Sequence, residues 1–332
     1  MTHSGPHLSV VIPAYKAAGH LGRCLDALSP AVQTAEEGRW EVIVVDDLSP
    51  DATAELAEER GARVVRHEVN RGAAAARNTG AAAARGEILL FVDSDVVPSP
   101  GLVAGALAAF DGAEVAATGR YEPEPANETA FAHYKALWTF WNWEVTGAAT
   151  GESGHLQGAL AAIRKDVFDG LGGFDEAYQG GNVEDYELSA RLREAGHRIA
   201  FDDRLRGKHH FPGFTTVARN YWDRTRMWLR LSPELKGFSS GQASRRSGIA
   251  AVLAASSAAG HLALPVAWPL APLVAVVDVG WLIAASPFLR WVRRERGLRF
   301  ALYAAGVHYS LSVVIGAAAA SSPFGAGTRG GS

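Results

Sequence analysis

Short apolar runs alternate with segments of helical spacing in the N-terminal part of the chain. Residues 8–15 (LSVVIPAY) and 40–47 (WEVIVVDD) are almost continuously apolar and rich in β-branched residues, a pattern typical of parallel strands buried on both faces. Helical spacing follows each run, and ARVVRHE and EILLFVDSD supply two further strands. The alternation predicts an α/β fold with a doubly wound, mixed but mainly parallel sheet and helices on both faces.

The pattern changes after residue 236. GFSSGQASRRSG (residues 237–248) has the composition of a linker. Beyond it lie three apolar stretches, each about the ~20 residues that a bilayer requires, at residues 249–268, 270–289 and 300–320. We therefore expect a catalytic domain over residues 1–236 and a membrane-associated region of about three hydrophobic helices over residues 249–332. Histidines, a proline and an aspartate interrupt the stretches, so buried helices of a soluble protein remain the alternative.

Charges near these stretches favour the membrane interpretation. Arg245 and Arg246 precede the first stretch, and FLRWVRRERGLRF places five arginines between the second and the third. The positive-inside rule then puts the catalytic domain in the cytoplasm, at the cell membrane. The N-terminus lacks a basic segment followed by a signal-type apolar run, which agrees with this orientation.

Composition excludes several classes of protein. The chain has 332 residues, 48% of them hydrophobic, which is enough for a substantial core. A formal net charge of -3 gives no basic field of the kind that attracts nucleic acid. Cys24 is the only cysteine, so neither an internal disulfide nor a multi-cysteine zinc site is possible. Neither a P-loop nor a GxGxxG fingerprint occurs.

Carboxylates follow two of the expected strands. Asp46 and Asp47 end the second strand, and Asp93 and Asp95 end the fourth in FVDSD. In doubly wound sheets, ligands bind beyond the carboxyl ends of the strands, and Mg²⁺ or Mn²⁺ prefers carboxylate and phosphate oxygens. A turn cluster is the alternative for each motif taken alone.

Three further segments hold candidate functional residues. Arg77 lies on an alanine-rich helix in NRGAAAARNTG, where it could pair with a phosphate or with Asp47. Glu184 and Asp185 stand at the start of a helix, either as a general base or as helix caps. In KHHFPGFTT, a histidine could complete a metal site.

An aromatic segment, FAHYKALWTFWNWEV at residues 131–145, allows three interpretations. It could stack on sugar rings, lie at a membrane interface, or form a core helix.

Seven motifs occur in an order that resembles the family 2 glycosyltransferases across about residues 8–235. They are LSVVIPAYKA, VVDDLSPDAT, NRGAAAARNTG, FVDSD, LGGFDE, VEDYELSARL and HHFPGFTT. The joint match is far more specific than any single motif. The resemblance implies a GT-A fold and an inverting, metal-dependent transfer of a sugar from a nucleotide-diphosphate sugar.

The resemblance also implies a role for each matching residue. The donor nucleotide would be bound by Pro13, Tyr15, Asp47, Arg77, Asn78, Asp93 and Ser94. Mg²⁺ or Mn²⁺ would be held by Asp93, Asp95 and His210, with His209 as the alternative to His210. Asp185 would be the catalytic base and Glu184 would shape the acceptor side.

Two departures from the family pattern narrow the expectation. Leu48 stands where the family's DDGS motif has glycine, and the QxxRW element of processive synthases is missing. We therefore expect transfer of a single sugar to a glycan or lipid-linked acceptor. The alternative from another class is a membrane-tethered sugar-nucleotide-binding protein without catalysis. A sugar-phosphate nucleotidyltransferase is disfavoured because no glycine-rich loop follows VVIPA.

Overall fold

The computed structural model describes residues 6–33, 35, 38–146, 151–177, 183–231 and 245–322. The chain divides into two compact units. Unit 1 comprises Met1–Glu128 and Trp143–Phe211, and unit 2 comprises Thr129–Asn142 and Pro212–Ser332. The division groups a mid-chain helix with the C-terminal helices. Most of the expected linker, residues 237–244, lies outside the described residues.

Unit 1 is built on a mixed sheet of eight strands in the order β3-β2-β1-β4-β7-β6-β8-β5. Strands β1 to β4 are parallel, as the apolar runs predict, while β7 lies antiparallel to both of its neighbours. The expected α/β class is thereby confirmed. The strands are β1 Leu8–Ala14, β2 Trp40–Asp46, β3 Arg63–Arg66, β4 Ile88–Val92, β5 Val96–Pro98, β6 Ala116–Tyr121, β7 Leu160–Arg164 and β8 Ala200–His209.

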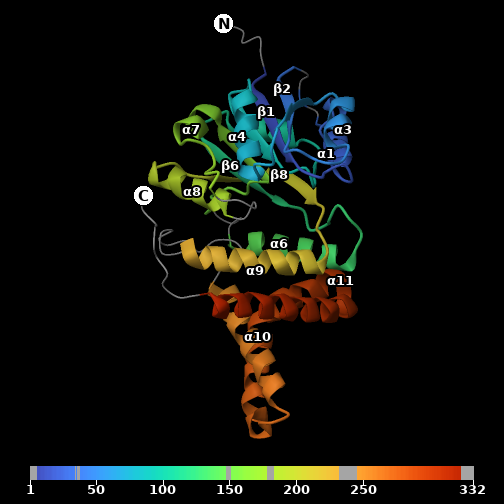
Figure 1. The fold of residues 1–332 in the computed structure, drawn as a ribbon, viewed down its shortest axis with the longest axis vertical. Helices are drawn as coiled ribbons and strands as arrows, with labels where there is room; N and C mark the ends of the chain where they lie inside the picture. The colour runs from blue at the N-terminus through green and yellow to red at the C-terminus, as the bar shows by residue number, and fades with distance from the viewer. Residues whose placement is uncertain are drawn as a thin grey trace. The chain divides into compact units, whose positions relative to one another are not determined.

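Helices cover both faces of this sheet. In Figure 1, α1 and α3 lie on one side of the first strands and α4 and α7 on the other, as right-handed crossovers require for this strand order. The small residues of α4 allow close packing, since a Cβ on Gly80 would lie 2.3 Å from Val11 Cγ1. The helices are α1 Leu21–Ala27, α2 Pro30–Gln33, α3 Thr53–Glu59, α4 Ala73–Ala83, α5 Leu102–Ala109, α7 Lys165–Gly170 and α8 Glu184–Glu194.

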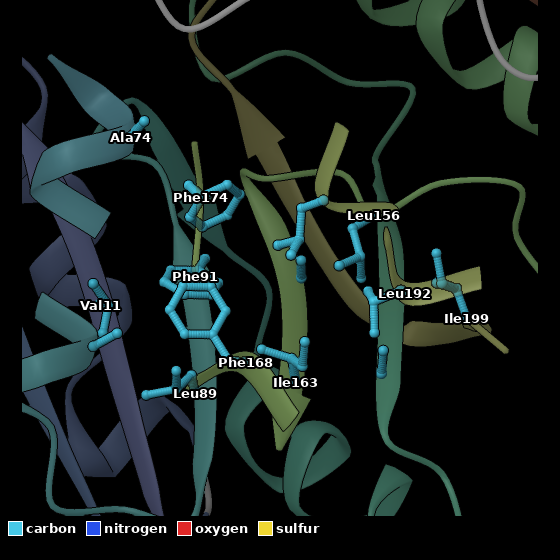
Figure 2. Close-up of a cluster of buried hydrophobic side chains, with 14 residues drawn as sticks. Val11, Ala74, Leu89, Phe91, Leu156, Ile163, Phe168, Phe174, Leu192 and Ile199 are labelled. Atoms are coloured by element: carbon cyan, nitrogen blue, oxygen red, sulfur yellow. The ribbon is translucent and has the colours of Figure 1, made fainter. Parts of the chain in front are cut away.

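One hydrophobic cluster joins the elements that carry the two acidic motifs (Figure 2). Phe91 of β4 packs against Phe168 and Phe174, with ring centroids 5.4 and 5.3 Å apart. Leu188 and Leu192 of α8 are fully buried in the same cluster. Because β4 leads into FVDSD and α8 begins at Glu184, this packing fixes the two motifs relative to each other.

Unit 2 is helical. Its elements are most of α6 (Ala130–Thr146), α9 (Phe214–Leu231), α10 (Arg245–Ala263), a short 3-10 turn η3 (Trp268–Leu270) and α11 (Ala271–Ser321). Gly297, with φ of 80°, breaks α11 into a first half, residues 271–296, and a second half, residues 298–321. Three helical segments therefore occupy the expected hydrophobic region.

The aromatic segment up to Trp141 contributes to the core of unit 2. Tyr134 is 1% exposed, and Trp138 and Trp141 stack on each other with Phe288 against both rings. Ala304 and Leu311, from the third apolar stretch, are buried in the same cluster. The core-helix interpretation of the aromatic segment is the one that these contacts support.

Among the described residues, one helix, Trp268–Ser321, is long and apolar enough to cross a membrane.

Candidate active site

A cavity of about 630 Å³ opens at the carboxyl ends of the first strands of unit 1. Seven of the residues predicted to bind donor or metal line it: Pro13, Tyr15, Asp47, Arg77, Asp93, Ser94 and Asp95. The volume is in the usual range for small-molecule sites. Parallel strand ends meet here because β2, β1 and β4 are neighbours in the sheet.

Asp47 anchors one wall of the cavity. Its carboxylate accepts hydrogen bonds from the backbone nitrogens of Arg71 and Gly72, each at 2.8 Å, and from His67 Nδ1 at 2.7 Å. The Arg71 and Gly72 nitrogens lie at the N-terminus of α4, so the buried carboxylate satisfies backbone donors at that end of the helix. Asp47 therefore holds the loop in front of α4 in addition to lining the cavity.

Leu48, which stands at the glycine position of the DDGS motif, has an unusual backbone conformation. Leu48 has φ of 61°, a conformation that glycine adopts without strain and leucine rarely adopts. The Leu48 side chain is half exposed, so the tight backbone turn does not force it into the core.

Asp95 is the most perturbed acid of the cavity. Burial, followed by the negative charge of Asp93, raises its pKa to about 7. Its Oδ1 is buried and has no hydrogen-bond partner in the structure. A buried carboxylate oxygen without a partner is costly unless a cation or a proton satisfies it.

Arg77 connects the two acidic motifs. Its guanidinium donates to Asp93 Oδ1 at 2.7 Å and to Glu184 Oε1 at 2.9 Å. Burial alone would lower the pKa of Arg77, but the charges of Asp93 and Glu184 raise it above the ordinary value. The expectation that Arg77 could pair with Asp47 is wrong, because the side chain spans from FVDSD to the start of α8 instead.

The two acids of the ED pair occupy different environments. Glu184 is 3% exposed and accepts from Arg77 and from the Val183 backbone nitrogen. Asp185 is partly exposed, accepts from the Tyr186 nitrogen at 2.9 Å, and places Oδ2 3.5 Å from the Gly158 nitrogen. Asp185 is therefore the acid of the pair with access to solvent.

An aromatic stack supports the start of α8. The His155 ring lies between Trp143 and Tyr186, with centroids 5.2 and 4.8 Å away. Burial lowers the pKa of His155 to about 4, so the imidazole is neutral at pH 7. Tyr186, which follows Asp185, is thus held by stacking.

Asn78 lies outside the cavity lining and clamps a neighbouring loop. Its Nδ2 donates to the Phe174 carbonyl at 2.9 Å and to Glu176 Oε1 at 3.0 Å, and its Oδ1 accepts from the Phe174 nitrogen. These contacts use both ends of the amide. The structure thus gives Asn78 a packing role, while the predicted donor contact stays untested.

The histidine nearest to Asp95 is His209. His209 Nε2 lies 3.4 Å from Asp95 Oδ2, because the register of β5 and β8 pairs His209 with Val96. His210 turns the other way: its Nδ1 lies 3.1 Å from Arg23 Nη2, and burial and Arg23 lower its pKa. Among the described residues, no group of three acids, histidines or cysteines is already placed to hold a metal, and the ligand set Asp93, Asp95 and His210 stays a prediction.

Two residues that line the cavity were not predicted from the sequence. Arg71 lines the cavity and forms an ion pair with Glu176 at 2.9 Å, and Asn70 donates to the Asp47 carbonyl. The only signal for them is the polar NRG that follows the third strand. His67, which bonds to both Asp47 and Thr79, gave no signal beyond its place at the end of that strand.

The arrangement can bind and neutralise a phosphorylated ligand. The cavity lining includes the buried Asp95 oxygen without a partner, which a cation could satisfy, and the guanidinium of Arg71, whose side chain is 44% exposed. Beyond Arg77 lies a partly exposed carboxylate, Asp185, that can accept a proton.

Residues 9–172 match the family described as Glycosyl transferase family 2. The glycosyltransferase AglE of Haloferax volcanii is 28% identical over 217 residues, which cover 63% of this chain and 68% of AglE. The pre-mycofactocin glycosyltransferase of Mycobacterium tuberculosis is 32% identical over 210 residues, which cover 60% of this chain. The match spans only 42% of that protein.

Solved structures share the fold. The mannosyltransferase PcManGT from Pyrobaculum calidifontis, in complex with GDP-Man and Mn²⁺, superposes with a TM-score of 0.57 at 18% identity, covering 96% of this chain and 87% of that one. S. aureus TarS 1-349 in complex with UDP-GlcNAc gives a TM-score of 0.50 at 18% identity, covering 93% and 90%.

Proposed function

This chain belongs to glycosyltransferase family 2, and we propose that it transfers one sugar from a nucleotide-diphosphate sugar to an acceptor hydroxyl or phosphate, with inversion at the anomeric carbon. The observation that carries the proposal is the cavity that gathers seven predicted donor and metal residues at the strand ends. The similar PcManGT was solved with GDP-Man and Mn²⁺, which agrees with a donor of this class.

The residues of the cavity fit a divalent cation. Asp95 supplies a buried oxygen without a partner, and Asp93 lies beside it with a side chain that is 29% exposed. Carboxylate oxygens of this kind suit Mg²⁺ or Mn²⁺, and such a cation would offset the charge that grows on the departing diphosphate. We assign Asp95 as the principal ligand, Asp93 as its neighbour, and His209 as a more suitable imidazole than His210 in this conformation.

The remaining roles follow from access and charge. Asp185 takes the proton of the acceptor as the new bond to the anomeric carbon forms, while the bond to the diphosphate oxygen breaks on the opposite face. Glu184 and Arg77 are too buried to meet the acceptor and instead hold Asp93 and Asp185 in register. Pro13, Tyr15 and Ser94 line the space for the nucleotide.

For the acceptor, we propose a lipid-linked or cell-envelope glycan met at the cytoplasmic face of the membrane. The apolar C-terminal helix supports this placement. The second candidate function is sugar-nucleotide binding without catalysis. An Asp185 that is partly exposed and in reach of solvent favours the enzyme.

A donor screen tests the proposal. Membranes that contain the full-length protein are incubated with Mn²⁺ and a panel of UDP-, GDP- and dTDP-sugars, and the products are read by mass. We expect one donor to yield a nucleoside diphosphate and a glycosylated product whose anomeric configuration is inverted in its NMR spectrum. Binding of donors with no product from any acceptor extract would favour the binding protein, and a retained configuration would refute inversion.

A further inference from the structure

Helix α10 and the first half of α11 form a two-helix hairpin with an apolar exterior. Between residues 247 and 289 the only acidic or basic side chain, histidine aside, is Asp278. Large apolar side chains face outward along both arms, and those nearest the tip are the most exposed: Leu262 at 83%, Val266 at 90% and Trp268 at 78%. A patch of this size on a soluble protein marks an interaction surface.

The polar side chains of the two arms pair with one another or with the second half of α11, and of these groups Ser257 is fully buried while the His261 side chain is 54% exposed. Asp278 accepts from Ser257 Oγ at 2.5 Å and lies 3.1 Å from His261 Nε2, and Ser257 also bonds to Tyr309. The two arms touch closely, since a Cβ on Gly260 would lie 2.6 Å from Val274 Cγ2. Small residues at helix contacts and internally satisfied polar groups are what an apolar solvent demands.

Burial argues against a core helix of a soluble protein. Only 22% of the most apolar window of the helix at Trp268–Ser321 is buried. A core helix would have most of that window covered. The hairpin therefore presents its apolar surface to something outside the described chain.

Arginines surround the base of the hairpin. Arg246 starts the first arm, and five exposed arginines follow the second arm around the break at Gly297. These five are Arg290, Arg293, Arg294, Arg296 and Arg299. An apolar tip with arginines at its base matches an anionic bilayer, in which acyl chains lie beneath negatively charged headgroups.

The second half of α11 limits how deep the hairpin can reach. It packs across the first arm, where Gly316 lies so close that a Cβ would be 2.3 Å from the Ala251 carbonyl and 2.6 Å from Ala255 Cβ. From residue 255 to the end of α10 at residue 263, a helix rises about 12 Å. With the short turn at the tip, this is about half of the ~30 Å hydrocarbon core.

The third apolar stretch, which the sequence predicts as a span, packs against other helices of unit 2. Ala301, Ala304 and Leu311 of the second half of α11 are buried against α6 and α9 in the core of unit 2. A helix that serves as a core element cannot give its buried face to lipid. In Figure 1 this half of α11 runs alongside α9, while α10 projects away from both.

We propose that the hairpin inserts tip-first into a single leaflet of an anionic membrane, without crossing it, and that the arginines at its base contact lipid phosphates. The protein would then be monotopic: neither arm would reach the opposite leaflet, and the second half of α11 would stay outside the acyl region. This proposal concerns attachment alone, so it stands or falls independently of the reaction in unit 1.

Flotation tests the insertion. Full-length protein is mixed with vesicles of phosphatidylcholine alone or rich in phosphatidylglycerol. We expect stronger binding to the anionic vesicles, and a loss of about 100-fold or more in the variant Leu262→Glu/Val266→Glu, because each buried charge strongly disfavours the acyl region. The matched control is Val69→Glu, an exposed valine of unit 1, which should bind as wild type does. Equal binding of the tip variant and the control would overturn the proposal.

Depth is tested with single cysteines, which need no other change because Cys24 is buried and is the only native cysteine. A fluorophore on Trp268→Cys should be quenched most by nitroxides deep in the acyl chain, and one on Arg293→Cys by headgroup nitroxides. On intact cells, an impermeant maleimide should modify neither Trp268→Cys nor Ser321→Cys. Modification of the first from outside would show a spanning hairpin, and modification of the second would show a third span; either result refutes single-leaflet insertion.

Discussion

Replacement of Arg77 by methionine removes the one cation that joins FVDSD to the ED pair in the described structure. Arg77 is 4% exposed, and its guanidinium lies 2.7 Å from Asp93 and 2.9 Å from Glu184, which is itself 3% exposed. Removal of one partner from a buried ion pair leaves an uncompensated charge and costs about 3–5 kcal/mol. For a domain of this size, the melting temperature should fall by roughly 10 °C.

The assay is thermal unfolding of the purified full-length protein, followed by circular dichroism, beside the rate of nucleoside diphosphate release. Arg77→Lys should lose about half as much stability, because one ammonium cannot reach both carboxylates. Arg77→Met/Glu184→Gln should regain part of the stability of Arg77→Met, since the stranded buried charge is gone. Transfer should remain impaired in all three variants.

Arg71→Met is the matched control. Arg71 pairs with Glu176 at a similar distance of 2.9 Å, but both side chains are more than 40% exposed, so the pair contributes about 1 kcal/mol or less. Equal melting temperatures for Arg71→Met and Arg77→Met would show that the buried ion pair does not stabilise unit 1. Arg77 would then be a ligand contact and not the link between the two motifs.

Three further variants test individual environments. Asp95→Asn should raise the free energy of unfolding of the metal-free protein at pH 8 by about 1–3 kcal/mol and should abolish Mn²⁺ binding measured by calorimetry. The pKa of Asp95 in the folded protein, about 7, lies above its value in the unfolded chain, so the stability of the wild type should approach that of the variant as pH falls below 7. The pKa of His155 is about 4 in the folded protein, below its value in the unfolded chain, so the wild type should lose stability as pH falls from about 6.5, by about 2 kcal/mol at pH 5. His155→Phe should abolish this loss, and an unchanged difference between the melting temperatures at pH 7 and pH 5 would contradict the prediction. Asn78→Ala should cost about 1–3 kcal/mol through the loss of its hydrogen bonds to Phe174 and Glu176 while the Kd for nucleoside diphosphate is unchanged, and a weaker Kd without loss of stability would restore a donor-binding role.

The parts of the fold that depend on the local pattern of apolar and polar residues could be predicted from the sequence. The expected strands at residues 8–15 and 40–47 appear as Leu8–Ala14 and Trp40–Asp46 because uninterrupted β-branched runs leave few other ways to bury them. The convergence of Asp47, Asp93 and Asp95 in one cavity followed from the rule that parallel strands share a carboxyl edge.

Contacts set by tertiary packing could not be predicted in this way. Arg77 was expected to pair with a phosphate or with Asp47, and its contact with Glu184 could not be foreseen because the two residues lie 107 positions apart. His209 and His210 are adjacent in sequence, and only the register of β8 against β5 decides which one faces Asp95. The third apolar stretch has the hydropathy of a membrane span but packs as a core helix, which composition alone does not distinguish.

We propose that Asp185 acts as a base on the acceptor while the cavity lined by other residues holds the donor. The most direct measurement compares wild type with Asp185→Asn in the donor screen, with nucleoside diphosphate and Mn²⁺ affinities measured on the same samples. We predict that the variant loses transfer and keeps both affinities, because the cavity is lined by other residues. Full transfer by Asp185→Asn would show that Asp185 is not the base, and loss of nucleotide binding together with transfer would show that Asp185 also serves the donor site.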